Sequence, residues 1–531
     1  MNKLIALAFV MLIQLSNAQT LTYWVRLKDK NSTTFSLKHP EAFLSAKALE
    51  RRQRQHIEIV QNDLPVSLFY IQEIRKTGVQ LTHWSKWFNT VSIATDDLTK
   101  VEAIKALPFV QSVQLVDHPV SVNRVSKFES LQFSNTNAYE EKERSTPTAY
   151  NYGPSFKQAD QIGIVCMHEN GFNGDGVTIA VLDAGFLNAN TISAFDSLRL
   201  ENRLLGTRDF ATGDTMVFED DSHGTMVLSC MTGNLPGQLI GTAPKAKYWL
   251  LRTEVVATES IQEEMNWAVG AEFADSVGAD IISTSLGYST FDDSLTNHTY
   301  KDMDGNTTII SKAADIAASK GIFVTVSAGN EGSNEWFRIT APSDADSVLC
   351  VGAIDSLGGL AYFSSRGPSY DGRVKPNTVA RGYKAYLATP SDTLGFANGT
   401  SFSCPITAGA VACLWQSGIN KTNMQLLHAI EESASQYANP DSLKGYGIPD
   451  FCKAKDILTG LANYSVLKNT LNVYPNPFQS SFTVLYTPAK QELITLELRD
   501  LTGRVLKTQA LKVNAGQPTK LNFNADQELA A

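Results

Sequence analysis

The chain has 531 residues, too many for one hydrophobic core, so we expect two to four domains. Apolar residues make up 43% and charged residues 19%, which is typical of a folded globular protein and excludes a disordered or fibrous one. The net charge of −9 and the lack of a long basic run argue against a dedicated nucleic-acid binder, so we expect no nucleic-acid partner.

The first residues have the three-part layout of a secretory signal peptide. Met1-Asn2-Lys3 precedes an apolar run from Leu4 to Leu15, and small residues follow at Ser16-Asn17-Ala18. The run is too short to span a membrane comfortably, and we expect no membrane span elsewhere. A buried N-terminal helix is the alternative. The pattern predicts a signal peptide over residues 1–18 and a mature protein that is secreted, extracellular or at the cell surface.

Residues 19–120 predict a small domain of mixed α and β structure. Residues 23–27 have the pattern of a strand. Apolar residues at helical spacing predict a helix from Leu98 that stops before Pro108, and residues 110–116 return to a strand pattern. Residues 121–150 are polar and lack periodicity, which indicates a linker.

Residues 151–462 predict a larger α/β domain. Helical stretches, one from Ser260 to about Val277 and another from near Thr400, alternate with short apolar runs at residues 177–182, 248–251, 281–282, 322–326 and 348–351. Strands that are apolar on both faces and separated by helices indicate a parallel sheet between two helix layers. The fold class that we expect is therefore a three-layer α/β domain.

Residues 470–531 predict a small β-sandwich module. Short strands over residues 482–486 and 494–498 are followed by a turn at Thr502-Gly503. The six cysteines could form disulfides in an exported chain. However, four of them lie inside apolar runs, which favours small buried side chains over a disulfide framework: Cys230, Cys350, Cys404 and Cys413.

Three polar residues of the central domain fit one kind of chemistry. Asp183 follows a buried strand, and parallel sheets place their sites at the carboxyl ends of strands. His223 comes directly before small residues that are expected to begin a helix, and Ser401 lies in the first turn of another helix. A serine hydroxyl needs a base to remove its proton, and the base needs a carboxylate to orient it. Asn330, after another buried strand, could donate to an oxyanion together with the Ser401 N–H.

The motifs around these residues resemble those of subtilisin-like serine proteases, the subtilases. They are VLDAG at Asp183, SHGT at His223, SLG at Ser285-Leu286-Gly287, SAGNEG at Asn330 and GTSFSCP at Ser401. Their order, Asp then His then Ser, is the subtilase order. The resemblance implies a subtilisin-like catalytic domain and a serine endopeptidase. In this reading Asp183 orients the histidine, His223 is the general base and acid, Ser401 attacks the peptide carbonyl, and Asn330 stabilises the oxyanion.

The resemblance also implies how a polypeptide substrate is held. Ser285-Leu286-Gly287 and Ser327-Ala328-Gly329 would flank the cleft and pair with the substrate as an added strand. The Ala341-Pro342 bond would be cis. No cofactor is required for this chemistry and no metal ligand is assigned, although the family often binds structural Ca²⁺. Asp302, Asp304 and Asn306 could suggest a calcium loop, but a polar turn is favoured.

The chain departs from the family pattern at several positions near these motifs. Ala184 stands where the family usually has Ser or Thr, so one hydroxyl donor near Asp183 is lost, and Met226 replaces a second histidine. The stretch Phe402-Ser403-Cys404-Pro405-Ile406 also differs. We interpret Cys404 as a packing residue and not as a reactive thiol, because apolar surroundings raise a thiol pKa. None of these changes removes a reacting group.

The flanking units resemble parts of exported subtilases. Residues 19–120 resemble an inhibitory propeptide, which would cover the cleft until it is cut off within residues 121–150. Residues 470–531, with VYPNPF from Val473, resemble the sorting domain of type IX secretion, although its usual terminal strands are missing before Ala531 and we expect the module to be incomplete. The expected partners are polypeptide substrates and the chain's own propeptide. A catalytically silent binding protein on the same scaffold is the rival hypothesis, and the oligomeric state stays open.

Overall fold

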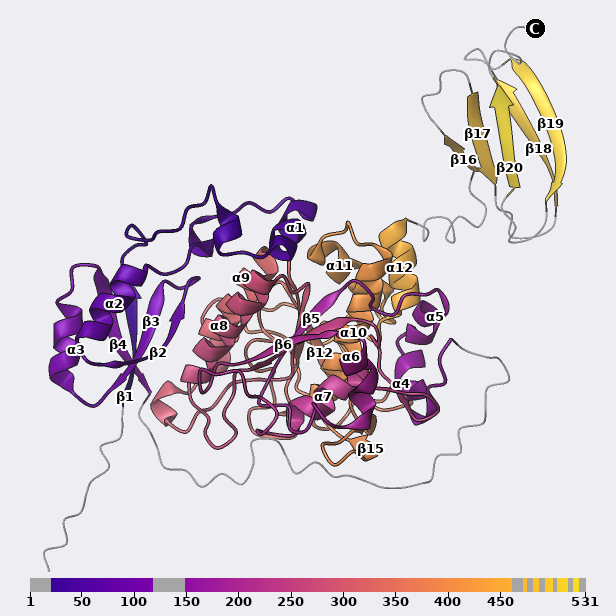
Figure 1. Ribbon diagram of the computed structural model, residues 1–531. Helices are drawn as coiled ribbons and strands as arrows, with labels where there is room; N and C mark the ends of the chain where they lie inside the picture. Colours follow the sequence, from indigo (N-terminus) through magenta and orange to yellow (C-terminus); the bar gives the residue numbers. More distant parts are fainter. Residues whose placement is uncertain are drawn as a thin grey trace, which may run out of the picture. The chain divides into compact units, whose positions relative to one another are not determined.

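The computed structural model describes residues 21–117 and 149–460, together with the strand segments 471–474, 481–486, 492–499, 504–513 and 519–524. The chain forms two compact units, Met1–Lys455 and Asp456–Ala531 (Figure 1). The predicted signal peptide and almost all of the predicted linker lie outside the described residues. No helix of the described part is long and apolar enough to cross a membrane.

An antiparallel sheet backed by helices forms the N-terminal domain. Tyr23, Val25 and Leu27 alternate inward along the first strand, and they pack against Ile71 and Ile74 of a helix. The strands lie in the order β2 (Gln80–Ser85), β3 (Thr90–Thr95), β1 (Leu21–Leu27) and β4 (Val110–Asp117). The helices are α1 (Ala46–Arg54), α2 (Leu68–Lys76) and α3 (Leu98–Lys105). The predicted mixture of α and β structure is confirmed.

A seven-stranded sheet is the centre of the larger domain. Its strands lie in the order β13 (Thr378–Arg381), β12 (Val348–Ile354), β11 (Phe323–Ser327), β10 (Ile281–Thr284), β5 (Thr178–Asp183), β9 (Lys247–Arg252) and β6 (Leu204–Asp209). Every neighbouring pair is parallel. β5, β10, β11 and β12 are buried along their whole length. This burial explains their continuous apolar sequences, and the predicted parallel sheet is confirmed.

Helices cover both faces of this sheet. α8 (Gln262–Val277) and α9 (Ile309–Ser319) pack on one face, and α7 (His223–Thr232) and α10 (Thr400–Ser417) pack on the other (Figure 1). α8 ends at Gly278, whose φ of +85° suits glycine, as the sequence predicts. The remaining helices are α4 (Phe156–Asp160), α5 (Ile164–Glu169), α6 (Asp196–Leu200), α11 (Asn423–Ser433) and α12 (Phe451–Thr459). Two small hairpins pair β7 (Asn234–Leu235) with β8 (Leu239–Ile240) and β14 (Ala385–Ala388) with β15 (Leu394–Ala397).

The N-terminal domain is joined to α8 by buried charged groups. Asp275 of α8 pairs with three cations of the N-terminal domain, at 2.5 Å from Arg51, 2.9 Å from Arg52 and 3.2 Å from Lys86. Glu272, one turn earlier, accepts hydrogen bonds from the backbone of residues 86 and 87 and from the Ser85 hydroxyl. The two domains therefore form one compact unit.

The N-terminal domain does not line the cleft that contains the candidate catalytic residues. All of the residues that line this cleft fall between positions 223 and 402. None of the described residues of the N-terminal domain lines this cleft, and residues 118–148 lie outside the described residues, so the expectation that the propeptide covers the cleft stays a prediction. Glu272 and Asp275 hold the described part of the domain against α8.

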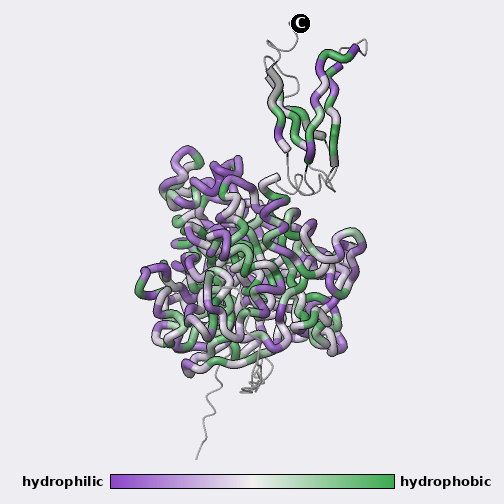
Figure 2. The backbone as a smooth tube through the Cα atoms, turned by 90° about the vertical axis from the view of Figure 1, so that its right-hand side faces the viewer, coloured by the Kyte–Doolittle hydropathy of each residue, from purple (hydrophilic) through white to green (hydrophobic). Residues whose placement is uncertain are grey.

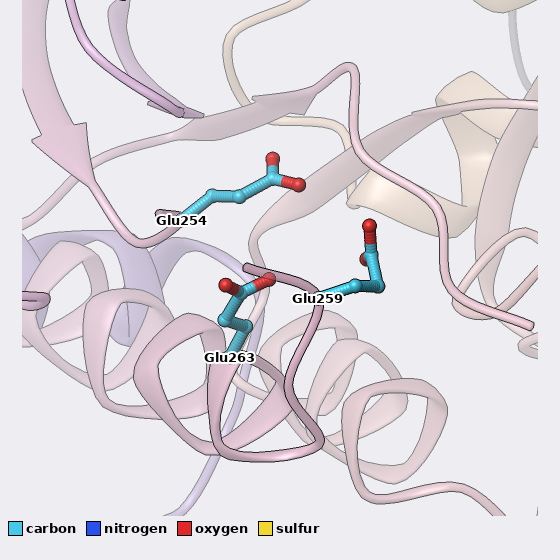
Figure 3. A group of neighbouring side chains, drawn as sticks. All are labelled: Glu254, Glu259 and Glu263. Atoms are coloured by element: carbon cyan, nitrogen blue, oxygen red, sulfur yellow. The ribbon is translucent and has the colours of Figure 1, made fainter. Parts of the chain in front are cut away.

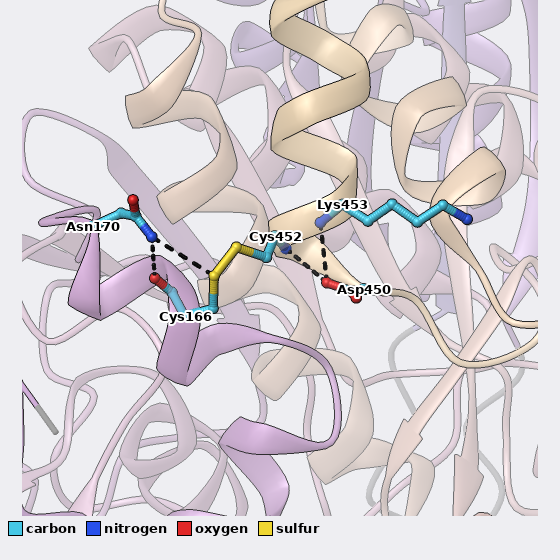
Figure 4. The surroundings of a disulfide bond; sticks show 5 residues. All are labelled: Cys166, Asn170, Asp450, Cys452 and Lys453. Atoms are coloured by element: carbon cyan, nitrogen blue, oxygen red, sulfur yellow. Dashed lines mark hydrogen bonds between the residues drawn. A yellow bond between two sulfur atoms is a disulfide. The ribbon is translucent and has the colours of Figure 1, made fainter. Parts of the chain in front are cut away.

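A disulfide joins Cys166 of α5 to Cys452 of α12, with 6.0 Å between their Cα atoms (Figure 4). The sequence analysis disfavoured disulfides, and it was wrong for this pair. The two residues are 286 positions apart, so only the fold brings them together. The other four cysteines are free and buried, in agreement with their apolar surroundings.

The C-terminal unit consists of short antiparallel strands. β16 (Leu471–Tyr474), β17 (Ser481–Tyr486) and β20 (Thr519–Asn524) form one sheet, and β18 (Glu492–Arg499) pairs with β19 (Val505–Val513). Hydrophobic and hydrophilic residues alternate along these strands, as Figure 2 shows. Phe482 and Val484 are buried on one face of β17 and pack against Leu496, Leu498 and Leu521. The predicted strand-rich module is confirmed, while its predicted turn at Thr502-Gly503 lies outside the described residues.

Candidate active site

The topology brings the carboxyl ends of three central strands together. Asp183 ends β5, Ser285 follows β10, and Ser327 ends β11, and these three strands are neighbours in the sheet. Because parallel strands present their carboxyl ends at one edge, residues far apart in the sequence meet there.

Asp183 is fully buried at the end of β5. One of its carboxylate oxygens, Oδ1, accepts a hydrogen bond of 2.8 Å from the Ala184 backbone N–H. The same oxygen lies 2.8 Å from Nδ1 of His223. Asp183 therefore fixes the orientation of the imidazole ring, which is the role expected from its position.

His223 is the first residue of α7. Its backbone N–H donates to Asp221 Oδ1 at 2.7 Å, which anchors the start of the helix. The next residue must be glycine, since a Cβ at Gly224 would lie only 2.3 Å from the Gly185 carbonyl oxygen. This close approach brings α7 against the loop that follows Asp183. The close packing of α7 against this loop therefore explains why a glycine follows His223.

The charges around His223 favour its protonated form. Burial alone lowers the pKa of an imidazole, but the carboxylate of Asp183, acting as a charge and as a hydrogen-bond acceptor, outweighs it. Asp221 and Glu254 add to the effect, so the pKa of His223 is raised above its ordinary value. A base of this kind is stabilised when it accepts a proton.

Ser401 is the second residue of α10 and lines the same cleft as His223. Gly399 precedes the helix with a φ of 153°, a conformation that favours glycine and that lets the chain enter the helix abruptly. The Ser401 carbonyl oxygen accepts a hydrogen bond of 2.9 Å from the Ser285 hydroxyl. This bond ties the first turn of α10 to the segment after β10.

Asn330 lies on the same cleft, and the start of α10 fixes its side-chain amide. Its Oδ1 atom accepts hydrogen bonds of 2.9 Å from both the N–H and the hydroxyl of Thr400. With the oxygen held in this way, the amide nitrogen is the end that can donate to a group in the cleft. Asn330 and the Ser401 N–H therefore belong to one site.

The cleft has a volume of about 270 Å³ and is lined by most of the predicted binding residues. Ser285, Leu286 and Gly287 line it, as do Ser327 and Gly329. Ala328 does not. It is fully buried and packs against Ile339 and Cys350, because the residue between two cleft-facing neighbours turns toward the core.

A family model described as "Subtilase family" matches residues 174–447, which is more than half of the chain. The chain belongs to the subtilase family. The match contains Asp183, His223, Asn330 and Ser401, and the resemblance found in the motifs is confirmed.

Two further family models match the parts that flank the subtilase domain. Residues 22–132 match "Peptidase S8 propeptide domain, Bacteroidota", and residues 472–527 match "Secretion system C-terminal sorting domain". The predicted propeptide and sorting domain are therefore confirmed. The sorting domain marks this subtilase as a secreted or cell-surface protein.

Similar proteins align with the subtilase domain. Subtilisin E of Bacillus subtilis (strain 168) is 29% identical over 283 residues, which cover 52% of this chain and 66% of that protein. Subtilisin of Bacillus pumilus is 29% identical over 279 residues, covering 52% of this chain and 90% of that protein. Subtilisin BL of Lederbergia lenta is 26% identical over 282 residues, which cover 53% of this chain and 91% of that protein. The aligned part thus spans just under two thirds of the length of Subtilisin E.

The departures of this subtilase from its family pattern have visible effects. Ala184 offers only a backbone donor, and Asp183 Oδ2 is buried without a hydrogen-bond partner among the described residues. The Cys404 thiol is buried and its pKa is raised to about 12 by burial, which fits a packing role. The Ala341-Pro342 bond is cis, as the resemblance implies.

Several cleft residues of this subtilase escaped the sequence analysis. Glu254, Glu259 and Glu331 place three carboxylates on the lining, and Asn334, Thr340, Phe363, Asn398, Gly399, Thr400 and Phe402 complete it. The rule that found Asp183 could have found Glu254, which follows the carboxyl end of β9 by two residues.

Proposed function

We propose that this subtilase is a secreted serine endopeptidase that hydrolyses peptide bonds in polypeptides through an acyl-enzyme. The observation that supports it is the 2.8 Å contact between His223 Nδ1 and Asp183 Oδ1 in the cleft that also contains Ser401. Asp183 is the orienting carboxylate, His223 the general base and acid, Ser401 the nucleophile and Asn330 the oxyanion donor.

In the proposed reaction, Ser401 Oγ attacks the carbonyl carbon of the scissile peptide. His223 Nδ1 is engaged by Asp183, so Nε2 is the nitrogen that accepts the Ser401 proton. His223 then gives this proton to the leaving amine as the C–N bond breaks. Water, deprotonated by the same nitrogen, hydrolyses the ester, which restores the Ser401 hydroxyl.

The negative charge on the carbonyl oxygen is stabilised by two donors. The Asn330 amide is held by Thr400, so little reorganisation is needed when the charge develops. The Ser401 backbone N–H lies in the first turn of α10, where N–H groups have no partner within the helix. Both donors favour the transition state over the bound substrate.

The substrate would lie extended between the two walls of the cleft. Its backbone would pair with residues 285–287 on one side and with Ser327 and Gly329 on the other. The chemistry needs no cofactor, since base, nucleophile and oxyanion donors are all side chains or backbone groups of this chain.

The propeptide is the other proposed partner. It would inhibit the enzyme in the precursor, and the cut that releases it would fall within residues 121–150. We expect the N-terminus of the active enzyme to lie in that segment. N-terminal sequencing of an active form that still begins at Gln19 would contradict this maturation route.

Labelling with a fluorophosphonate probe tests the proposal directly. The processed protein should be labelled on Ser401, while Ser401→Ala should bind no probe and hydrolyse no peptide, and His223→Ala should label far more slowly. Ser417→Ala is the matched control, because this serine lies at the far end of α10 and donates to the Leu414 carbonyl. A correctly folded, processed protein that takes up no probe would favour the silent binding protein.

A further inference from the structure

Arg252, the last residue of β9, joins three segments at the edge of the sheet that holds the active site. It lies beside Asp183 in the pairing of β9 with β5, and it is 7% exposed. Its Nε donates to the Ala184 carbonyl oxygen at 3.1 Å, Nη1 donates to Asp209 Oδ2 at 2.7 Å, and Nη2 lies 3.3 Å from Asp220 Oδ1. These partners follow β5, end β6 and precede α7, so one side chain connects three distant parts of the chain.

The contact with Ala184 bears on the orientation of Asp183. The Ala184 N–H donates to Asp183 Oδ1, which is also the oxygen that faces His223 Nδ1. Asp183 Oδ2 has no hydrogen-bond partner among the described residues, so the orientation of the carboxylate depends on Oδ1 and on the position of the Ala184 backbone. Ala184 has no hydroxyl, and Arg252 holds this residue by its carbonyl oxygen.

The contact with Asp220 bears on the position of His223. Asp220 is followed by Asp221, whose Oδ1 accepts a hydrogen bond of 2.7 Å from the His223 backbone N–H. This loop packs tightly on the turn after β5, because a Cβ at Gly185 would lie 2.6 Å from the Asp220 Cβ. Arg252 therefore binds both segments at the place where they meet.

Negative charge is concentrated around this guanidinium. Burial raises the pKa of the Asp220 carboxyl, the carboxylate of Asp209 adds to the rise, and the positive charge of Arg252 opposes it. Three more carboxylates converge on the segment that follows β9 (Figure 3): Glu254, Glu259 and Glu263. Like charges on separate segments repel one another, and a cation among them offsets that repulsion. An arginine suits the place, since its planar guanidinium can bind a carbonyl and two carboxylates at once.

We propose that Arg252 is a positioning residue of the active site, which holds the segments of Asp183 and His223 so that Oδ1 and Nδ1 stay 2.8 Å apart. The inference rests on the catalytic roles proposed above for these two residues. Among the described residues, Arg252 does not line the cleft, so its loss should act on kcat and leave KM nearly unchanged.

Arg252→Met in the processed enzyme tests this role. We expect kcat to fall by about 10- to 10²-fold, because a small displacement of a reacting group is costly in rate. Arg203→Met is the matched control. Arg203 is 6% exposed and binds the Ala246 carbonyl and the Glu201 carboxylate, but it lies at the opposite end of β6 from Asp209. Both variants should lose stability, and only Arg252→Met should lose kcat. Arg252→Lys, which keeps the charge without the planar fork, should recover part of the loss.

A second variant carries less risk of disturbing the fold. The side chain of Asp220 is 30% exposed, and Asp220→Asn removes its charge while keeping its size. This variant should lower kcat several-fold. Combined with Arg252→Met, it should cause no further loss, because the two residues act through one contact.

A measurement without turnover separates this role from the proposed activity. In the Ser401→Ala chain, NMR follows the exchange with water of the proton that His223 Nδ1 shares with Asp183. Exchange should be at least about tenfold faster in Arg252→Met, because the pair opens more often, and unchanged in Arg203→Met. A processed parent that hydrolyses no peptide would refute the proposed function, and the exchange rates would then decide the role of Arg252. The proposal is overturned if Arg252→Met exchanges this proton at the parent's rate, keeps the kcat of an active parent, or loses no more kcat than Arg203→Met.

Discussion

Replacing Asp275 by alanine should release the propeptide from the subtilase domain. Asp275 is fully buried and pairs with Arg51, Arg52 and Lys86 of the propeptide. Removing it leaves three buried cations without their shared carboxylate, and breaking a buried ion pair costs about 3–5 kcal/mol. Since about 1.4 kcal/mol corresponds to a factor of ten, the dissociation constant should rise by a factor of about 10² to about 4 × 10³.

Dissociation can be measured after a controlled cut. In a Ser401→Ala chain with a cleavage site for a foreign protease placed within residues 121–150, the two parts stay together only through their interface. The dissociation rate of the cut complex is then followed on a biosensor surface. Glu102→Gln is the control, because Glu102 pairs with Lys105 on the exposed face of α3. A rate for Asp275→Ala within tenfold of the parent would refute the reasoning.

Four further predictions concern the catalytic domain. Asn330→Ala should lower kcat by about 10²–10³-fold with KM nearly unchanged, a magnitude measured for the oxyanion asparagine of subtilisin itself; full kcat would exclude the oxyanion role. As the pH is lowered, kcat/KM should fall with a midpoint above about pH 6.5, the ordinary pKa of histidine. The pKa of His223 is raised, and only its neutral ring can accept the Ser401 proton. Asp221→Asn should lower that midpoint in a pH–rate profile, and no movement would contradict its share in the raised pKa. Lys375→Met should lower the free energy of unfolding of the domain by about 3 kcal/mol, measured by calorimetry. The buried Lys375 ammonium donates to the carbonyls of Ala345 and Val348 and to Asn377, and these acceptors would lose their partner. Lys312→Met, on the surface, is the control and should have little effect.

Local sequence patterns predicted the layers and the reacting groups because both follow short-range rules. Buried strands read as continuous apolar runs, and Asp183 follows one of them at the edge where parallel strands end. Contacts between distant segments could not be predicted in the same way. The pairing of Cys166 with Cys452, and of Arg51 with Asp275, depends on how the finished domains pack, and no local pattern carries that information.

The inward turn of Ala328 shows the same limit on a smaller scale. The motif suggests three consecutive binding residues, but neighbouring side chains of an extended segment point in opposite directions. Ser327 and Gly329 line the cleft, and Ala328 packs in the core. A motif therefore identifies the segment, and the backbone decides which of its residues reach the substrate.

The disulfide between Cys166 and Cys452 also has a mechanical consequence. Cys452 lies just before position 456, where the compact unit that contains the sorting domain begins along the chain. A pulling force on the sorting domain during export, or from a cell-surface anchor, would pass through α12 and directly across this covalent bond to α5. The chain could not be peeled back beyond Cys452 under load. A single proteolytic nick anywhere between these two cysteines would likewise leave both fragments attached to one another.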